Sequence, residues 1–347
     1  MSLSLRLQRA WLARGAIAWA LLPLAGLYGS VVALRKLAFR AGWRHIERLP
    51  VPVIVVGNLI AGGAGKTPTC LALVDLLRQR GWTPGIVSRG YGGNPAGDVL
   101  LVTPATPASA CGDEPLLMQR RSGAPVAVGR RRAQAGHALL AAHPAVDLIV
   151  CDDGLQHRQL ARDAQVIVFD ERGAGNGWLL PAGPLREPMP SALPERSVLL
   201  YNAPAATTPL PGHVVQRSLG RFTLLQAWLD GTRADSNAVG DAGGIPRGRR
   251  LVAAAGLAHP QRFFSMLRDA GLDIAELPLP DHHDFAVLPW PSDTADVVVT
   301  EKDAVKLDPA RLGTTRVWVA TLDFQLPPAF AADLLALLPQ RAPTAHH

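Results

Sequence analysis

The sequence predicts an α/β protein: a doubly wound, mostly parallel sheet, a second, smaller α/β domain, and an N-terminal membrane-associating helical segment. Three observations predict this fold class. Short apolar, β-branched runs alternate with helical stretches from about residue 51 to 202. The same alternation resumes after residue 250, beyond stretches rich in proline, glycine and aspartate. Finally, residues 15–34 form an uncharged stretch of twenty residues, which is long enough to span a membrane.

These changes of pattern divide the 347 residues into four expected parts. We expect 1–48 to be the hydrophobic membrane-associating segment, 49–202 the core domain, 203–249 a linker or hairpin region, and 250–347 a C-terminal α/β domain.

The composition narrows the class of partner. A hydrophobic content of 48% supports a packed core and excludes a disordered chain. The net charge of +7 favours an anionic partner, either membrane lipid, nucleic acid or a phosphorylated substrate. The arginines are dispersed apart from residues 130–132, and no basic stripe interleaves with aromatic residues, so nucleic acid is not expected. Nothing in the sequence calls for an obligate protein partner.

The uncharged N-terminal stretch has the features of a segment that lies at a membrane surface. Arginine and lysine flank it on both sides, so the charges give no orientation for a crossing. Trp11, Trp19, Tyr28 and Trp43 are the amphipathic rings expected at headgroup level. We therefore expect peripheral or monotopic attachment to the cytoplasmic face of a membrane. A helical hairpin buried against the core is the alternative, because apolar runs of this length occur in both settings.

A glycine-rich run, "GGAGKT", lies between an apolar run, "VPVIVV", and a stretch of helical periodicity. Strand, glycine-rich turn and helix in this order are the context that a phosphate-binding loop requires. The expected nucleotide-binding residues of this loop are Gly62, Gly63, Ala64, Gly65, Lys66, Thr67 and Pro68.

Two side chains of this loop have specific expected roles. Lys66 would reach the β- and γ-phosphates of a nucleotide, and Thr67 would ligate Mg²⁺ at the positive end of the helix. The loop departs from the usual pattern at one position, because Ile60 stands where the first glycine would be. The Gly62-Gly63 pair then supplies the flexibility. The sequence predicts a P-loop fold that binds a nucleotide.

A second polar cluster, "CDDGLQH", follows the apolar run "VDLIV". Carboxylates at the carboxyl end of a neighbouring strand hold Mg²⁺ in P-loop enzymes, so Asp152 and Asp153 are candidate metal ligands, with Asp152 preferred. Aspartates that merely cap a turn before glycine are the alternative. Gln156 and His157 would lie beside the phosphate site and are candidates for nucleotide contact.

Two loops carry candidates for acid–base chemistry. Asp113 precedes a predicted helix and is either an N-cap or the base that accepts a proton from an attacking hydroxyl. The segment "PDHHDF" places His282 and His283 among aspartates, a density of titratable groups that favours a catalytic or metal role.

Several other residues at strand ends or in loops are candidates for binding an anionic substrate, because arginine suits phosphate oxygens. These substrate-binding candidates are Arg89, Tyr91, Arg130 and Arg186.

Seven motifs follow one another along the chain: "VPVIVVGNLIAGGAGKTP", "SRGYGG", "GDEP", "CDDGLQH", "LPAGPLREP", "PDHHDF" and "TEKDAVK". Taken together, these motifs resemble the tetraacyldisaccharide 4'-kinase family, which makes lipid A. The resemblance implies transfer of the γ-phosphoryl group of ATP, with Mg²⁺, to the 4'-hydroxyl of a tetraacylated glucosamine disaccharide 1-phosphate. It also implies that the substrate is an anionic glycolipid and that the protein acts at the cytoplasmic face of the bacterial inner membrane.

The resemblance assigns roles to individual residues as well. Lys66 becomes an ATP ligand and a catalytic residue, Asp152 and Asp153 the metal-associated acids, and Asp113 the candidate base. One histidine of the "DHH" run would assist Asp113, and the sequence leaves open which one.

Two other functions are compatible with a GGxGKT loop. The first is a membrane-recruited switch ATPase of the partitioning type, although such proteins carry a lysine just before the glycine pair, where this chain has Ala61. The second is a non-enzymatic, nucleotide-gated membrane adaptor, in which the "DHHDF" loop would be structural.

Overall fold

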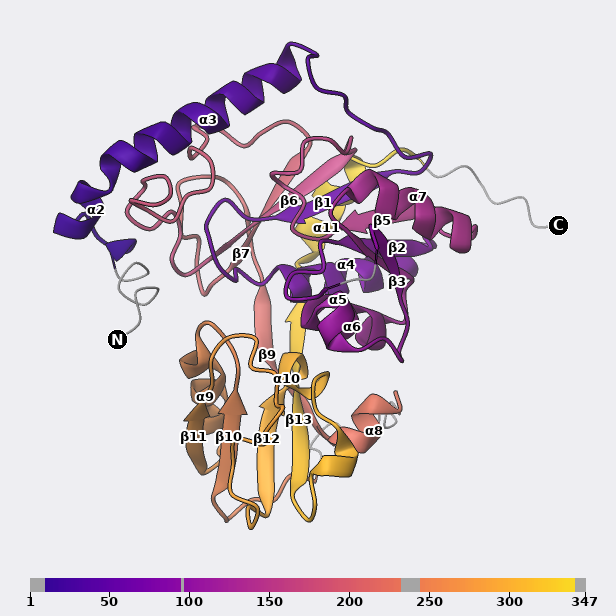
Figure 1. The fold of residues 1–347 in the computed structure, drawn as a ribbon, viewed down its shortest axis with the longest axis vertical. Coiled ribbons are helices and arrows are strands. Elements are labelled where there is room, and N and C mark those ends of the chain that lie inside the picture. The colour runs from indigo at the N-terminus through magenta and orange to yellow at the C-terminus, as the bar shows by residue number, and fades with distance from the viewer. Residues whose placement is uncertain (1–9, 95–96, 232–243, 341–347) are drawn as a thin grey trace. The chain divides into compact units, whose positions relative to one another are not determined.

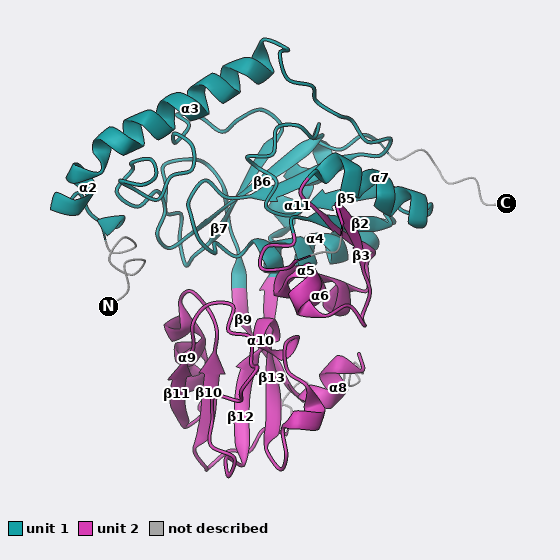
Figure 2. Cartoon of the chain, viewed as in Figure 1, with its two compact units in different colours: residues 1–89, 131–216, 325–347 teal, residues 90–130, 217–324 magenta. Residues whose placement is uncertain are grey.

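In the computed structural model, which describes residues 10–94, 97–231 and 244–340, the chain forms two compact units (Figure 2). Unit 1 comprises residues 1–89, 131–216 and 325–347, and unit 2 comprises residues 90–130 and 217–324. The sequence predicted one continuous core over 49–202 and one continuous domain after 250. The units divide the chain differently, because a local pattern does not determine which distant segments of the chain pack together.

Unit 1 is built on a parallel sheet with the strand order β2-β5-β1-β6-β7-β8 (Figure 1). Its apolar, β-branched strands are almost entirely buried, as expected for a parallel sheet covered on both faces. The strands are β1 (Val53–Gly57), β2 (Pro84–Ser88), β5 (Leu148–Cys151), β6 (Ala164–Asp170), β7 (Ser197–Asn202) and β8 (His213–Val214). The helices that accompany them are α4 (Lys66–Gln79), α7 (Arg132–Ala142) and α11 (Pro328–Ala336).

The order of these strands positions the two polar motifs of unit 1. From β1 the chain passes through α4 to β2, and β5 later inserts between these two strands. Strands β1 and β5 are parallel neighbours, with Val55 paired to Cys151. Their carboxyl ends therefore lie side by side, which brings the glycine-rich loop next to the aspartate pair. Ligands of open α/β sheets bind at such an edge.

The N-terminal region of unit 1 contains α2 (Ala16–Ala20) and α3 (Leu22–Arg40) (Figure 1). Among the described residues, α3 is the one helix long and apolar enough to cross a membrane, and 11% of its apolar window is buried. It is therefore not the buried hairpin of the alternative interpretation. More than half of each large apolar side chain on one of its faces is exposed, at Leu24, Leu27, Val31, Leu34 and Leu37.

The opposite side of the N-terminal region contacts the segment 178–187 of the same unit. The Tyr28 hydroxyl donates a 2.8 Å hydrogen bond to the backbone oxygen of Arg186, and Lys36 Nζ lies 2.7 Å from Glu187 Oε2. The rings of Trp19 and Trp178 meet edge to face with centroids 4.9 Å apart. These contacts hold α3 on unit 1 while its outer apolar face stays exposed.

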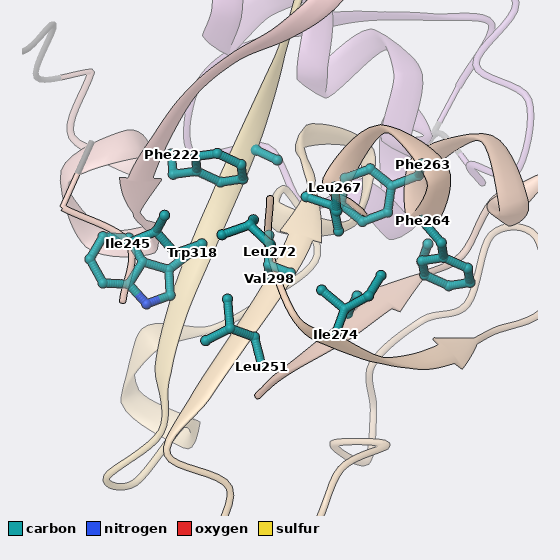
Figure 3. Close-up of a cluster of buried hydrophobic side chains, with 13 residues drawn as sticks. Phe222, Ile245, Leu251, Phe263, Phe264, Leu267, Leu272, Ile274, Val298 and Trp318 are labelled. Atoms are coloured by element: carbon teal, nitrogen blue, oxygen red, sulfur yellow. The ribbon is translucent and has the colours of Figure 1, made fainter. Parts of the chain in front are cut away.

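Unit 2 contains a five-stranded sheet with the order β11-β10-β12-β13-β9. Aromatic and aliphatic side chains from several of its elements, including Phe222, Phe264, Val298 and Trp318, form one of its cores (Figure 3). The strands are β9 (Gln216–Leu224), β10 (Leu251–Ala255), β11 (Ile274–Pro278), β12 (Asp296–Thr300) and β13 (Arg316–Gln325). Strand β9 lies in the region predicted as a linker or hairpin, of which residues 232–243 fall outside the described residues.

The remaining elements of unit 2 include an antiparallel pair, β3 with β4, formed by the segment 90–130. Helix α6 begins at Asp113, and α10 follows β12 with Thr300 as its N-cap, whose Oγ1 accepts from the Asp303 backbone N–H at 3.3 Å. These elements are β3 (Val99–Val102), β4 (Val126–Gly129), α5 (Ala108–Cys111), α6 (Asp113–Ser122), α8 (Leu225–Leu229), α9 (Pro260–Asp269), α10 (Glu301–Ala304) and the 3₁₀ turn η1 (Pro309–Arg311).

Candidate active site

The phosphate loop ends where α4 begins, at Lys66. Gly65 is the N-cap residue with φ of +90°, and no described side chain caps the helix, so the first backbone N–H groups of α4 remain available to an anion. A Cβ added at Gly65 would lie 2.1 Å from Asn202 Nδ2, which itself donates a 3.1 Å hydrogen bond to Ala64 O. Both the backbone conformation and the close approach therefore require glycine at this position.

The phosphate loop is held by hydrogen bonds from polar side chains that the sequence did not single out. Asn58 Nδ2 donates to Gly62 O at 3.0 Å, and the Lys66 ammonium donates to Asn58 Oδ1 at 3.4 Å. The Arg172 guanidinium donates to Ala61 O at 3.0 Å and to Gly63 O at 3.2 Å. Arg172 also pairs with the fully buried carboxylate at the end of β6, residue 170. An aspartate that ends an apolar strand was the available signal for this pair.

The two aspartates after β5 have different environments. Asp152 is buried and accepts hydrogen bonds from Ser88 Oγ at 2.9 Å and Cys70 Sγ at 3.7 Å. Asp153 faces the loop, with Oδ1 3.6 Å from Lys66 Nζ and 3.0 Å from Arg186 Nη1. Burial acts to raise the pKa of Asp153, but the two cations outweigh it and lower that pKa below its usual range. Asp153 is therefore ionised beside the phosphate-loop lysine.

The next two polar residues are also brought to this edge. Gln156 Nε2 donates to Asn58 O at 3.1 Å, and its Oε1 accepts from Arg186 Nη1 at 3.3 Å. Burial, and then the nearby Arg132, lower the pKa of His157 to about 4, so its imidazole is neutral at neutral pH.

The oxygen donors of this edge fit a magnesium ion that is bound together with phosphates. Mg²⁺ in such sites uses one or two protein oxygens and leaves the rest of its coordination to phosphates and water. The Thr67 hydroxyl at the start of α4 and the Asp153 carboxylate are hard oxygen donors of this kind. In the described part of the chain no group of three or more His, Cys, Asp or Glu side chains forms a self-sufficient metal site.

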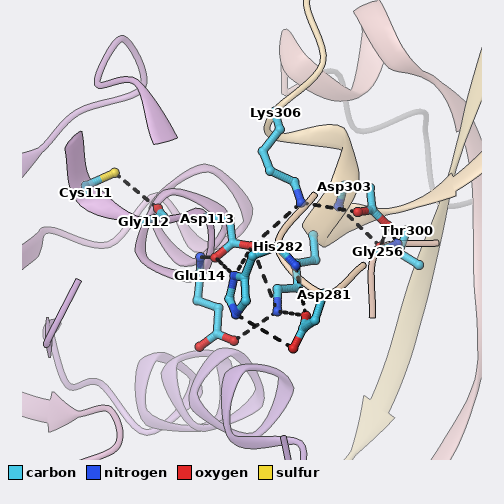
Figure 4. A network of polar contacts seen from close by, with 11 residues as sticks. Cys111, Gly112, Asp113, Glu114, Gly256, Asp281, His282, Thr300, Asp303 and Lys306 are labelled. Atoms are coloured by element: carbon cyan, nitrogen blue, oxygen red, sulfur yellow. Dashed lines mark hydrogen bonds and ion pairs between the residues drawn. The ribbon is translucent and has the colours of Figure 1, made fainter. Parts of the chain in front are cut away.

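A second polar cluster lies in unit 2, around Asp113 (Figure 4). His282 Nδ1 lies 3.1 Å from Asp113 Oδ1 and 2.9 Å from Oδ2, and the Glu114 backbone N–H donates to Oδ1 at 2.9 Å. The Asp113 side chain is 4% exposed, whereas that of His282 is 31% exposed. Burial acts to raise the pKa of Asp113, but the hydrogen bond from His282 and the charge of Lys302 lower it. The same hydrogen bond raises the pKa of His282.

The structure separates the two histidines of the "DHH" run. His282 contacts Asp113, while the ring of His283 packs edge-on against Phe285 with centroids 4.8 Å apart. The backbone of His282 has a φ of +61°, in the left-handed region that residues other than glycine rarely adopt.

The substrate-binding candidates are distributed over both units. Arg186 belongs to the acid cluster of unit 1, as described above. The exposed ring of Tyr91 lies 5.6 Å from the ring of His282 in unit 2. Arg89 in unit 1 and Arg130 in unit 2 are exposed, each directly after a strand. Their contribution to substrate binding stays a prediction.

A Lys-Thr phosphate loop after the first strand of a parallel sheet, strand-end acids beside it, and a carboxylate–imidazole pair define a P-loop phosphotransferase. The family model described as tetraacyldisaccharide-1-P 4'-kinase matches residues 17–339. The chain belongs to this family, as the motifs indicated, and it is a lipid A kinase that uses ATP and Mg²⁺.

Individual relatives agree with this assignment. The tetraacyldisaccharide 4'-kinase of Leptothrix cholodnii is 54% identical over 345 residues, which cover 98% of each chain. That of Methylibium petroleiphilum is 54% identical over 97% of this chain and 94% of the relative. Among solved structures, LpxK from Aquifex aeolicus in complex with ATP matches with a TM-score of 0.72 at 26% identity, covering 93% of this chain and 99% of that one. Nothing in these comparisons supports a switch ATPase.

Proposed function

We propose that the chain phosphorylates the 4'-hydroxyl of a tetraacylated glucosamine disaccharide 1-phosphate with the nucleotide-binding residues in unit 1 and the proton-accepting residues in unit 2. The observation that carries this division of roles is the contact between the buried Asp113 carboxylate and the partly exposed His282 ring. A phosphate loop alone would serve an ATPase or an adaptor equally well. A carboxylate held against an imidazole is the arrangement that activates a hydroxyl as a nucleophile.

In unit 1 the chain binds and orients the triphosphate. The loop amides and the start of α4 bind phosphate oxygens, and the Lys66 ammonium, 3.6 Å from Asp153 in this structure, turns to the β- and γ-phosphates. Thr67 and Asp153 supply oxygens to Mg²⁺, which when bound neutralises charge on the transferring phosphoryl group. Buried Asp152 accepts the hydrogen bond of Ser88 Oγ and so links the ends of β5 and β2.

In unit 2 the Asp113–His282 pair accepts the proton of the attacking hydroxyl. Ionised Asp113 accepts the hydrogen bond of the His282 Nδ1–H, so Nε2 is the ring atom left to take a proton. Nε2 also belongs to the more exposed member of the pair. Asp113 orients the imidazole and stabilises the imidazolium that forms, while the neighbouring Tyr91 ring is placed to contact the sugar.

We further propose that the chain works at the cytoplasmic face of the inner membrane, where its acylated substrate resides. The apolar face of α3 from Leu24 to Leu37 would lie among the acyl chains. Exposed basic side chains at Arg35, Arg40 and Arg44 would meet anionic headgroups. Arg89 and Arg130 remain our candidates for contacts with the 1-phosphate of the substrate.

The test is transfer of label from γ-labelled ATP to a tetraacyl disaccharide 1-phosphate in detergent micelles. The wild-type chain is expected to produce labelled lipid, and Lys66→Ala is expected to produce almost none. Release of free phosphate alone, with or without lipid, would contradict the proposal and favour a switch ATPase.

A further inference from the structure

Two lysines of the "TEKDAVK" segment converge on the carboxylate of Asp113. One of them, Lys306, is labelled in Figure 4. Lys302 lies in α10, and Lys306 follows two residues after the last residue of this helix. Lys302 Nζ is 3.9 Å and Lys306 Nζ 3.8 Å from Asp113 Oδ2, the oxygen that also lies 2.9 Å from His282 Nδ1.

The position of Lys306 is fixed by buried partners. Its Nζ lies 3.3 Å from Asp303 Oδ1 and 5.3 Å from the ring centre of Phe285. Asp303 is fully buried, and its Oδ2 accepts from Thr300 Oγ1 at 2.7 Å and from the Gly256 backbone N–H at 3.1 Å. A cation this well anchored keeps one geometry relative to Asp113.

Lys302 is surrounded by acids. Its Nζ lies 3.0 Å from Asp281 Oδ1 and 3.5 Å from Glu114 Oε1, in addition to Asp113. Asp281 Oδ2 is also 3.8 Å from His282 Nε2. Three carboxylates, at 113, 114 and 281, therefore surround the Lys302 ammonium, and two of them, at 113 and 281, also lie near the His282 ring. Without the lysine charge, mutual repulsion and burial would favour protonation of Asp113.

The consequence of such protonation follows from hydrogen-bond chemistry. A protonated Asp113 would donate to His282 Nδ1, and the neutral ring would then carry its proton on Nε2. That tautomer cannot take a proton from a hydroxyl at Nε2. An ionised Asp113 instead selects the ring with its proton on Nδ1.

We propose that Lys302 and Lys306 are positioning residues that keep Asp113 ionised and thereby hold His282 in the tautomer whose Nε2 accepts the proton. This inference rests on the proposed role of the Asp113–His282 pair. It gives the "TEKDAVK" segment a function in the reaction through electrostatics, although neither lysine needs to touch the substrate.

The decisive variant is Lys302→Met, which keeps the length of the aliphatic stem and removes the charge. Lys302→Arg restores the charge and serves as the rescue. Arg121→Met is a matched control, because Arg121 Nε pairs with Glu301 Oε1 at 2.9 Å and also joins α6 to α10. A variant that acts only by loosening these helices should resemble this control.

The measurement is kcat against pH at saturating Mg-ATP and tetraacyl disaccharide 1-phosphate. Loss of Lys302 removes a positive neighbour from both Asp113 and His282, so the pKa of each rises. The acid limb of the profile, where kcat rises with pH as the pair loses its proton, should therefore move to higher pH by about one unit. At a pH on this limb, kcat should be roughly tenfold lower than in the wild type. At higher pH, where kcat no longer depends on pH, the variant should reach the wild-type kcat. Lys302→Arg should keep the wild-type limb, and any loss in Arg121→Met should be independent of pH.

An acid limb that does not move in Lys302→Met, or that moves equally in Arg121→Met, would overturn the inference. If Lys302→Met does not fold, ¹⁵N NMR of the wild-type His282 ring at about pH 9 decides instead, because a proton on Nε2 would contradict the expected proton on Nδ1. The variants Asp113→Asn and His282→Ala test the proposed role of the Asp113–His282 pair separately from the role of the two lysines. Retained transfer in these variants refutes the proposed role of the pair, whereas lost transfer with an unmoved limb in Lys302→Met refutes only the role of the lysines.

Discussion

Replacing Arg172 with methionine should weaken both the fold of unit 1 and its affinity for Mg-ATP. Arg172 Nε lies 3.1 and 3.0 Å from the two oxygens of Asp170, and Nη2 lies 2.9 Å from Oδ2. The same guanidinium holds the carbonyls of Ala61 and Gly63. Arg172→Met removes all of these contacts at once.

The expected loss of stability follows from the burial of Asp170 and Arg172. Removing one member of a buried ion pair costs about 3–5 kcal/mol. Asp170 is fully buried, but in the variant it still accepts a 2.9 Å hydrogen bond from the backbone N–H of residue 172. The Arg172 side chain is 15% exposed. Both facts place the expected loss of stability near the lower end of this range, at about 3 kcal/mol. Two lost hydrogen bonds to the loop, at about 1 kcal/mol each, should lower the affinity for Mg-ATP by up to roughly 30-fold.

The assay is urea unfolding together with titration of Mg-ATP. Arg196→Met is a suitable control, because Arg196 also donates to two backbone oxygens, of Asp163 and Leu337, but does not hold the phosphate loop. Adding Asp170→Asn to Arg172→Met should restore part of the stability, because no buried charge is then left without its partner. Wild-type stability and wild-type ATP affinity in Arg172→Met would refute the reasoning.

Three further predictions concern the other parts of the chain. Because Asp113 raises the pKa of His282, the stability from this pair is fully present below the unfolded pKa of about 6.5 and is lost as pH rises through the folded pKa. Thermal unfolding should show that His282→Ala destabilises more at pH 6 than at pH 9, and a pH-independent loss would contradict this. Leu27→Asp with Leu34→Asp should reduce sedimentation with anionic lipid vesicles, whereas Val287→Asp, a comparably exposed position in unit 2, should not; equal loss in both would argue against α3 as the attachment site. Gly65→Ala should weaken Mg-ATP binding measured by calorimetry, because the added Cβ would be 2.1 Å from a side-chain nitrogen at a φ of +90°, and unchanged affinity would exclude this account of the loop.

The sequence was sufficient for the features that depend on local pattern. A buried apolar run, glycines and a periodic helix identified β1, the loop and α4. The strand end predicted an acid pair beside the loop with Asp152 preferred as the metal ligand, whereas the structure brings Asp153 to Lys66 and buries Asp152 against Ser88. The grouping of residues 90–130 with the C-terminal region was not predictable in this way. Its strands and helices have the local pattern of any α/β segment, and only the packing of the folded chain groups them with residues 217–324.

The site was predictable to different degrees for the same reason. Asp113 and His282 are 169 positions apart, so no spacing argument could join them. The family resemblance paired Asp113 with one of the two histidines, and the structure shows that this histidine is His282. Asn58, Arg172 and Asn202 were missed because each is a single polar residue whose role depends on the carbonyl that it meets in the folded loop.

The most direct test of the division of roles between the units compares Mg-ATP binding with phosphoryl transfer in Lys66→Ala and Asp113→Asn. We expect Lys66→Ala to lose both ATP affinity and transfer. Asp113→Asn should bind Mg-ATP as the wild type does while its kcat for lipid phosphorylation falls at least about 100-fold. Wild-type kcat in Asp113→Asn, or normal ATP affinity and normal transfer in Lys66→Ala, would contradict the account.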